Sequence, residues 1–422
     1  MSFAVEYAYP RMAPAPDLAA SIAALSGPGK LATVGFEARV DAIAELPRLI
    51  TAARSTLRSA LPAEGLAFLA SFLSREHLVS LVGREVRDIE ALSRFVRVES
   101  RKSIRMVPKG LVCHWVAGNV PLLALFSWAI SAVLGNRNLI RLSARQGDVV
   151  SPLLDALQAL SDTGRLIADE THVVWFDRHD HAAHASMSQA ADVRIAWGGR
   201  EAVDAIHNLQ RKWDCEDIIF GPRMSFAAID PQMIDAAGIR RLATDAVLFD
   251  QLACSSPQYI FVKGERGSRR VDDFVTRFSA AFAEQGRAYP RDLLGFSETF
   301  RIHLDRVRVL LNGGDIRRDG ATSWTVAVVD TPLPQVTCAN RFLQVIPFNS
   351  LDEIYARIPG NVQTVIINLD ATDTSEFTEH AAHLGVCRFP RPGEGNHFEN
   401  PWDGAGLVSR LTRSVIRTDA AS

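Results

Sequence analysis

The chain is organised around the stretch Gly110-Leu111-Val112-Cys113-His114-Trp115-Val116-Ala117-Gly118-Asn119-Val120-Pro121. From Gly110 to Asn136 it contains no Asp, Glu, Lys or Arg, and a run of that length could span a bilayer. However, polar and turn-forming residues interrupt its middle. A buried strand over 111–116, a turn and a buried helix over 122–134 therefore explain the run better than a membrane span.

Short apolar runs and helix-length segments alternate from residue 106 to residue 230. The expected strands are 110–116, 138–143, 171–176, 192–197 and 224–229. The expected helices between them are 122–134, 149–160, 182–190 and 200–210. Alternation of this kind predicts an α/β fold in which helices cover both faces of a parallel sheet, as in many nucleotide-binding domains.

A chain of 422 residues is too long for one simple core, so further domains are expected. Residues 1–105 are predicted to be mainly helical, with helices over 45–58, 63–74 and 78–95 after an irregular first forty residues. A second α/β unit is predicted over 231–390, followed by a C-terminal segment, 391–422. The elements expected in that second unit are helices at 234–249 and 270–285 and strands at 259–262, 307–311, 325–329, 342–347 and 364–368.

Composition excludes several classes of protein. Apolar residues make up 47% of the chain and the formal net charge is −2, which describes a globular protein without the basic excess of a nucleic-acid binder. The N-terminus lacks the basic-then-apolar order of a secretory signal. The five cysteines include no Cys-x-x-Cys pair, so neither a disulfide framework nor a zinc cluster is indicated, and a reducing cytoplasm is the expected location.

Cys254 is the candidate nucleophile. It lies in Asp250-Gln251-Leu252-Ala253-Cys254-Ser255-Ser256-Pro257-Gln258, directly before the strand-forming residues 259–262. Small neighbours leave its sulfur approachable, and the following strand would hold it in place, as acyl transfer through a thioester requires. The competing interpretation is a structural cysteine, because cysteine outside disulfides is among the most buried residue types.

Two turns at strand ends are candidate ligand contacts. In the first, Gly118 permits an unusual backbone conformation, and the amide of Asn119 could face a ligand or satisfy its own backbone. In the second, Trp197-Gly198-Gly199-Arg200 ends a strand and begins a helix, so its backbone can approach a phosphate or a nicotinamide. The Gly-x-Gly-x-x-Gly fingerprint of an ordinary Rossmann dehydrogenase is absent.

Two other kinds of site are not favoured. His179, His181 and His184 form a small cluster, but the region is typical of a solvated loop at a helix start, so no metal is expected. Ser255 and Ser256 lack the Gly-x-Ser-x-Gly setting of a serine hydrolase.

Taken together, these motifs resemble the acyl-CoA reductase family typified by the LuxC fatty-acid reductase of bacterial bioluminescence, within the aldehyde dehydrogenase superfamily. The resemblance covers roughly residues 100 to 415. Its motifs are Ala117-Gly118-Asn119-Val120-Pro121, Leu134-Gly135-Asn136, Ile140-Arg141-Leu142-Ser143, Trp197-Gly198-Gly199, Phe220-Gly221-Pro222, the Cys254 stretch and Pro401-Trp402-Asp403-Gly404. It implies an aldehyde dehydrogenase-like fold. Residues 1–105 would pack on a Rossmann-type nicotinamide-binding domain over 106–230, residues 231–390 would form a catalytic domain carrying Cys254, and 391–422 would return to the cofactor domain or to an oligomer interface.

The resemblance also implies a reaction. The Cys254 thiolate would attack an acyl thioester, the oxyanion would be held by the Asn119 side chain and the Cys254 N–H, and hydride would reduce the thioacyl-enzyme to an aldehyde. Hydrolytic relatives carry a glutamate base in a Glu-Leu-Gly-Gly motif. Here Ile219-Phe220-Gly221-Pro222 takes that place without a carboxylate, which favours a reductase over a dehydrogenase.

The expected cofactor is NADPH, with NADH possible. The residues expected to bind it are Arg141, Ser143, Arg145, Trp197, Gly198, Gly199 and Gly221. NAD-using relatives often hold the ribose with a glutamate where this chain has Ala144. Because Ala144 is followed by Arg145, a 2′-phosphate is favoured, unless Arg145 is an ordinary surface arginine.

Two alternative functions stay open at this point. One is an acyl transferase or thioesterase that uses the same cysteine, and the other is a non-catalytic member that binds a nucleotide or a partner. The expected partners are an acyl-CoA or acyl-carrier substrate, an acyl-activating synthetase and at least one further copy of the chain. The acyl group and its chain length are not indicated.

Overall fold

The computed structural model describes residues 6–9, 18–62, 65–116, 118, 122–143, 147–291, 293–334, 336 and 339–418. The chain forms two compact units, the first from residues 1–221 and 398–422 and the second from residues 222–397. The division after Gly221 corrects the expected boundary at 230. The reason is that strand β9 (Met224–Ile229) pairs with strands of the second sheet and not with the first.

The first unit contains a six-stranded sheet in the order β1-β6-β5-β4-β7-β8. All its neighbours run parallel except β1, which is antiparallel to β6. The strands are β1 (Glu6–Tyr9), β4 (Leu111–Trp115), β5 (Arg137–Arg141), β6 (Thr171–Trp175), β7 (Val193–Trp197) and β8 (Glu216–Phe220). Since β4 and β7 are neighbours although β5 and β6 lie between them in sequence, the strand order reverses there, as in a Rossmann-type sheet.

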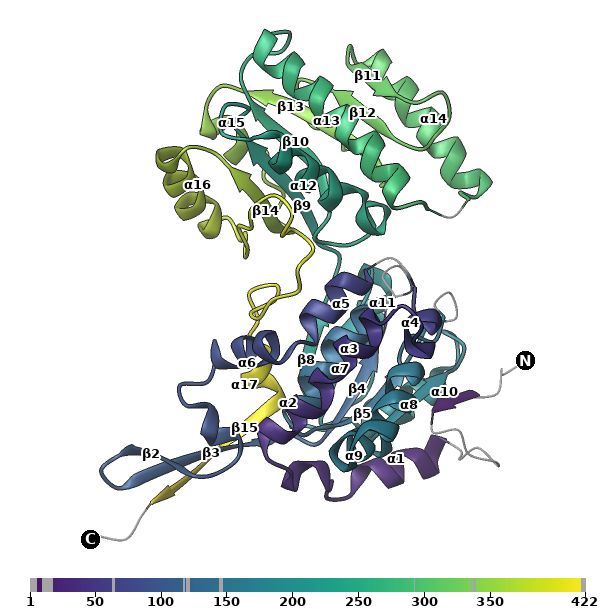
Figure 1. Cartoon of the computed structure of the whole chain (residues 1–422), viewed down its shortest axis with the longest axis vertical. Helices are drawn as coiled ribbons and strands as arrows, with labels where there is room; N and C mark the ends of the chain where they lie inside the picture. The colour runs from purple at the N-terminus through teal and green to yellow at the C-terminus, as the bar shows by residue number, and fades with distance from the viewer. Residues whose placement is uncertain are drawn as a thin grey trace. The chain divides into compact units, whose positions relative to one another are not determined.

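Helices cover this sheet as the alternating pattern predicts (Figure 1). Apolar residues of α1 (Leu18–Ser26), α10 (His181–Ala190) and α11 (Arg200–His207) join one core with the strands. The expected helix at 122–134 is α7 (Leu123–Val133), and it contacts β4 and β5. α8 (Ser151–Leu160) and α9 (Asp162–Asp169) follow β5 in sequence.

The N-terminal residues are more ordered than expected. α1 lies within the first forty residues, which were predicted to be irregular, and α2 (Phe36–Ala44) begins within them. Leu18, Ile22 and Leu25 occur at helical spacing and pack in the core, so their periodicity outweighs the nearby prolines. The remaining N-terminal helices are α3 (Leu46–Thr51), α4 (Thr56–Ala60), α5 (Leu66–Phe72) and α6 (Arg75–Gly83).

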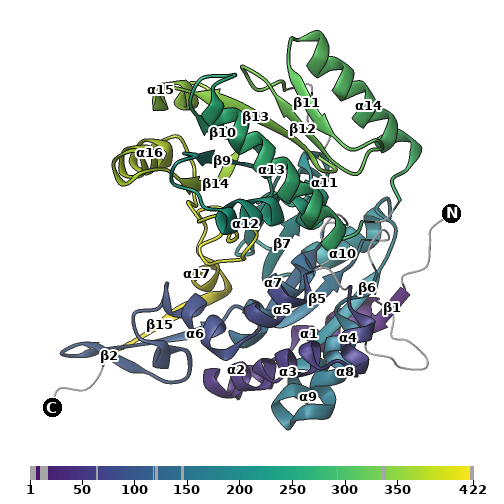
Figure 2. The same cartoon turned by 45° about the horizontal axis from the view of Figure 1, so that its top comes forward.

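The second unit contains a six-stranded sheet in the order β11-β12-β13-β10-β9-β14, parallel except for β11. α12 (Ala236–Val247) and α13 (Arg269–Ala288) lie side by side on one face (Figure 2), while residues of α14 (Phe296–Leu311) and α16 (Ala371–His383) join the core on the other. The strands are β10 (Pro257–Lys263), β11 (Asp315–Arg318), β12 (Thr325–Val328), β13 (Phe342–Phe348) and β14 (Val362–Asn368), and α15 (Leu351–Tyr355) follows β13.

The strand predicted at 307–311 is wrong, because these residues form the last turns of α14. Ile302 and Val309 of this helix are buried, whereas Val307, Leu310 and Leu311 are exposed. A helical period sustained over sixteen residues therefore outweighs a short apolar run.

The C-terminal segment returns to the first unit. β15 (Thr412–Thr418) pairs antiparallel with β3 (Lys102–Pro108), which also pairs with β2 (Val96–Glu99), and the three strands form a narrow ribbon (Figure 1). Among the described helices, none is by itself long and apolar enough to cross a membrane; only the bent pair α5–α6 reaches that length and composition when the two are joined.

Candidate active site

The carboxyl ends of β4 and β7 mark the candidate cofactor site in the first unit. Ligands of open α/β sheets bind outside the carboxyl ends of the strands, where the strand order reverses. Gly118 follows β4, and Gly198 and Gly199 follow β7, so two of the predicted turns flank the reversal point. Arg141 ends the neighbouring strand β5, and Ser143 lies two residues beyond it.

Gly199 gives this edge an open approach. It is the N-cap of α11, and a Cβ built on it would meet no other atom within 4 Å. The N–H groups of the first turn of a helix lack intrahelical partners and favour an anion. Gly198 is held by its N–H, which donates to the carbonyl oxygen of Phe220 over 3.1 Å. Gly221 follows Phe220 on the next strand, β8.

Trp197 is buried among aromatic rings. Its ring stacks on Phe220 with centroids 3.9 Å apart and lies tilted against Phe398 at 6.3 Å. Phe398 in turn stacks on Phe126 and Trp402. The Nε1 atom of Trp197 is buried and has no hydrogen-bond partner among the described residues, so it is available to a ligand.

Arg141 also carries a buried N–H group that has no hydrogen-bond partner among the described residues. Its Nη2 donates to the carbonyl oxygen of Phe176 over 2.9 Å, while its Nε is buried without a partner in the described part of the chain. Burial lowers the pKa of Arg141, and the nearby carboxylate of Asp177 opposes that shift. The side chain is therefore a largely dehydrated cation at the carboxyl end of β5.

Two predicted residues cannot be placed. Asn119, the expected oxyanion donor, and Arg145, the expected 2′-phosphate contact, lie outside the described residues, as does Ala144.

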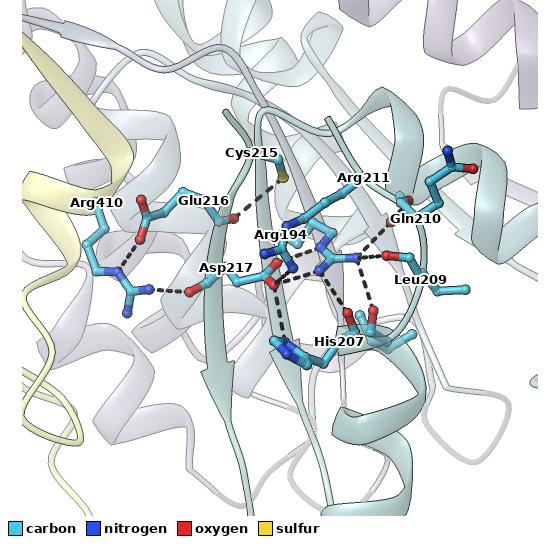
Figure 3. A network of polar contacts seen from close by, with 11 residues as sticks. Arg194, His207, Leu209, Gln210, Arg211, Cys215, Glu216, Asp217 and Arg410 are labelled. Carbon is cyan, nitrogen blue, oxygen red and sulfur yellow. Dashed lines mark hydrogen bonds and ion pairs between the residues drawn. The ribbon is translucent and has the colours of Figure 1, made fainter. Parts of the chain in front are cut away.

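The carboxylates of β8 lie at its amino end (Figure 3). Arg194, which is fully buried, pairs with Asp217 over 2.6 Å, and Arg410 pairs with Glu216 over 2.8 Å. The carboxyl end of the strand carries Phe220 instead. Ile219, which takes the place of the hydrolytic glutamate in the resemblance, carries no carboxylate, and the adjacent Phe220 packs on Trp197.

Cys254 lies in the second unit, on a turn that enters β10. It is half-buried, and Phe249, Asp250 and Gln251 before it have φ angles of 55°, 49° and 60°. Left-handed backbone costs a non-glycine residue about 1–2 kcal/mol, so this turn needs strong support. Part of that support comes from the amide of Gln251, which donates from Nε2 to the carbonyl oxygen of Pro257 over 2.9 Å.

Serine hydroxyls fix the residues on either side of the thiol. The Oγ of Ser225 on β9 donates to the carbonyl oxygen of Cys254 over 2.7 Å. The Oγ atoms of Ser255 and Ser256 donate to Oδ1 of Asn396 over 2.8 and 3.4 Å. Asn396 belongs to a loop whose Gly393 and Gly395 N–H groups donate to the buried carboxylate of Asp245 on α12.

The other described cysteines are poorer nucleophile candidates. Cys113 and Cys215 are buried, and burial raises the pKa of both thiols, that of Cys215 to about 11. Cys387 is exposed and follows α16.

The histidine cluster does not form a metal site in the described part of the chain. No group of three or more His, Cys, Asp or Glu side chains there could hold an ion. His184 instead accepts a hydrogen bond at Nδ1 from Nε1 of Trp115 over 2.9 Å.

The fold is that of the aldehyde dehydrogenases. The NAD-dependent benzaldehyde dehydrogenase of Corynebacterium glutamicum matches with a TM-score of 0.64 at 13% sequence identity, covering 95% of this chain and 89% of that protein. The predicted aldehyde dehydrogenase-like α/β fold is therefore confirmed.

Within this fold, the family model "Acyl-CoA reductase (LuxC)" matches residues 27–414. The chain belongs to the acyl-CoA reductase (LuxC) family, as its motifs predict. Two relatives are the long-chain acyl-protein thioester reductases of Vibrio harveyi, 22% identical over 74% of this chain and 65% of that protein, and of Aliivibrio fischeri, 24% identical over 70% and 60%. The chain thus spans less than two thirds of the length of either relative.

The residues at the reversal point of the first sheet fit the nicotinamide dinucleotide that the sequence motifs led us to expect. Gly199 leaves room above the N-terminus of α11, where a diphosphate is favoured. Arg141 and Trp197 each keep a buried N–H without a partner in the described residues, and a ligand would satisfy both.

Proposed function

We propose that the chain reduces an acyl thioester to an aldehyde, with Cys254 as nucleophile and a reduced nicotinamide as hydride donor. The observation that supports this most strongly is the setting of Cys254, a half-buried thiol on a strained, hydrogen-bonded turn within a LuxC-family chain. The names of the relatives favour a long acyl chain on a protein carrier, and acyl-CoA is the alternative donor.

In the first half-reaction the Cys254 thiolate attacks the carbonyl carbon of the thioester. A carbon–sulfur bond forms while the carbonyl electrons move to oxygen. Collapse of this adduct expels the carrier thiolate, which takes up a proton. The N–H of Cys254 is one proposed donor to the oxyanion, and the amide of Asn119 is the other.

In the second half-reaction the acyl carbon bound to Cys254 accepts a hydride, and hence two electrons, which a reduced nicotinamide would supply when bound. The carbon–sulfur bond then breaks, the aldehyde leaves and Cys254 is restored as the thiolate. Arg141, Trp197, Gly198 and Gly199 would hold the cofactor, with Ser143 and Gly221 beside them. We expect NADPH to be preferred because Arg145 would meet a 2′-phosphate.

Hydrolysis of the thioacyl-enzyme should be slow. The end of β8 carries Ile219 and Phe220 and no carboxylate, so the general base of a hydrolytic aldehyde dehydrogenase is missing there.

The test is oxidation of NADPH and NADH by purified protein with acyl-CoAs of short, medium and long chain and with an acylated carrier protein. Cys254→Ser should abolish both cofactor oxidation and aldehyde formation, while Cys387→Ser, which changes an exposed cysteine, should behave as the wild type. Release of the carrier thiol without cofactor oxidation would replace the proposal by a transferase or thioesterase. If Cys254 is never acylated by any thioester, a binding role would replace it.

A further inference from the structure

Asp250, four residues before the nucleophile, is bound twice to one distant segment. The Nε of Arg341 donates to Oδ1 of Asp250 over 2.6 Å. The backbone N–H of Asn340 donates to the carbonyl oxygen of Asp250 over 2.8 Å. Arg341 is only 3% exposed, so this ion pair is largely shielded from water. Both the side chain and the backbone of Asp250 are therefore fixed from the same direction.

The two segments that meet here share an uncommon conformation. Phe249, Asp250 and Gln251 have positive φ angles, and so do Ala339, Asn340 and Arg341, at 49°, 53° and 64°. Non-glycine residues rarely adopt this region, and consecutive examples persist only where the surroundings over-determine them. The bonds between Asp250 and the segment 339–341 join these two strained runs.

Arg341 also binds the C-terminal end of α13. Its Nη1 donates to the carbonyl oxygen of Gly286 over 3.1 Å, and its Nη2 donates to that of Tyr289 over 2.7 Å. These carbonyls lie at the C-terminal end of α13, where the last turn leaves acceptors without intrahelical partners. One guanidinium thus connects the end of α13, the start of β13 and the turn before Cys254.

We propose that Arg341 and Asp250 form a clamp that positions Cys254 for attack on the acyl carbon. Arg341 is a positioning residue in this role, since it acts through the turn. The inference rests on the proposed function only for the identity of the reaction that it serves. Without the clamp, the strained turn would relax and the thiol would move more freely. A misplacement of about 1 Å can cost roughly 100-fold in rate.

The clamp predicts opposite effects on two properties of Cys254. In Arg341→Met and Asp250→Asn, a small alkylating reagent should reach the half-buried thiol more often. The rate constant for iodoacetamide, read by mass spectrometry of the Cys254 peptide, should rise about threefold or more. The kcat of thioester reduction should fall about tenfold or more, with KM for the thioester within about threefold. In the double variant, the alkylation rate constant and kcat should change no further than in either single variant, because the two residues act as one unit.

Arg306→Met is the matched control. Arg306 is another buried arginine of the second unit, and its guanidinium donates to Thr325, Ala321 and Trp324. Its loss should lower stability without changing the alkylation rate or kcat of the folded protein. Arg341→Lys should restore part of kcat, because an ammonium can still pair with Asp250.

Circular dichroism and thermal melting must first show that each variant is folded. Unchanged alkylation in the folded Arg341→Met and Asp250→Asn proteins would overturn the clamp. Equal changes in Arg306→Met would overturn it too, since they would indicate general loosening. So would a fall in both alkylation and kcat, which would indicate an effect on thiol ionisation. If the wild type reduces no thioester, the proposed function fails, but the alkylation rates still decide the clamp.

Discussion

The Oδ1 of Asn396 accepts a hydrogen bond from the Oγ of Ser255 over 2.8 Å, across 141 positions of sequence. The Nδ2 of the same amide donates to the carbonyl oxygen of Asp245 over 2.9 Å. Asn396 therefore connects Ser255, the residue after the candidate nucleophile Cys254, with helix α12.

Replacing Asn396 by alanine should destabilise the second unit. The Ser255 hydroxyl and the Asp245 carbonyl would both stay buried without their partner, which costs about 2–4 kcal/mol. Urea unfolding should show this loss. Asn361→Ala, which removes an exposed amide with a 3.4 Å contact to Pro222, should change stability by less than about 0.5 kcal/mol. Equal effects of the two variants would contradict the structural role of Asn396.

Two substitutions at Gly199 should distinguish the effect of added side-chain volume from the effect of added negative charge on cofactor binding. A Cβ fits there without contacts, so Gly199→Ala should leave the dissociation constant of the reduced nicotinamide within about threefold. Gly199→Asp places a carboxylate where the diphosphate is expected at the N-terminus of α11. Repulsion should weaken binding about tenfold or more in a fluorescence titration. If Gly199→Asp binds as the wild type does, the cofactor diphosphate lies elsewhere.

The first unit should lose stability in mild acid. Burial lowers the pKa of His114, His172 and His184 to about 4, from an ordinary value of 6.5. Because the unfolded chain binds more protons between these values, this contribution is present above pH 6.5 and lost as the pH falls through 4. The loss amounts to at most roughly 3 kcal/mol per histidine. His172→Asn, which keeps a hydrogen-bonding side chain beside Ser21, should flatten the dependence of the melting temperature on pH over this range.

Asp245 should give the second unit the opposite dependence. Burial raises its pKa to about 7 from 3.8, although the N–H groups of Gly393 and Gly395 oppose the shift. The folded form then binds the extra proton, so this contribution is complete below pH 3.8 and lost as the pH rises through 7. Asp245→Asn should match the wild type near pH 5 and exceed it above pH 8 in thermal unfolding. A variant less stable than the wild type above pH 8 would show that the hydrogen bonds from Gly393 and Gly395 outweigh the cost of burying the charge.

The sheet strands were the most predictable part of the fold. Buried parallel strands are continuous apolar runs, which is why β4, β5, β6 and β7 could be located within two residues. β8 was missed because it begins with Glu216 and Asp217, which leave an apolar run of only three residues. The sheet to which β9 belongs could not be predicted, since its sequence carries no information about its pairing partners.

The candidate site likewise contains residues that the sequence indicates and residues that only the fold brings together. Cys254, Gly198 and Gly199 could be singled out as candidates because small residues at strand ends have a local signature. Arg341 and Asn396 could not, because each reaches the Cys254 turn only through contacts between distant parts of the chain.

The return of the chain to the first unit has a consequence for synthesis on the ribosome. The amide of Asn136 donates to the carbonyl oxygen of Leu411, 275 positions later, and β3 obtains one of its two partners only from β15. The second unit is continuous in sequence, and all of its strands are made before β15. The first unit must wait for its closing segment, with β3 exposed as an open strand edge that could pair with another nascent chain.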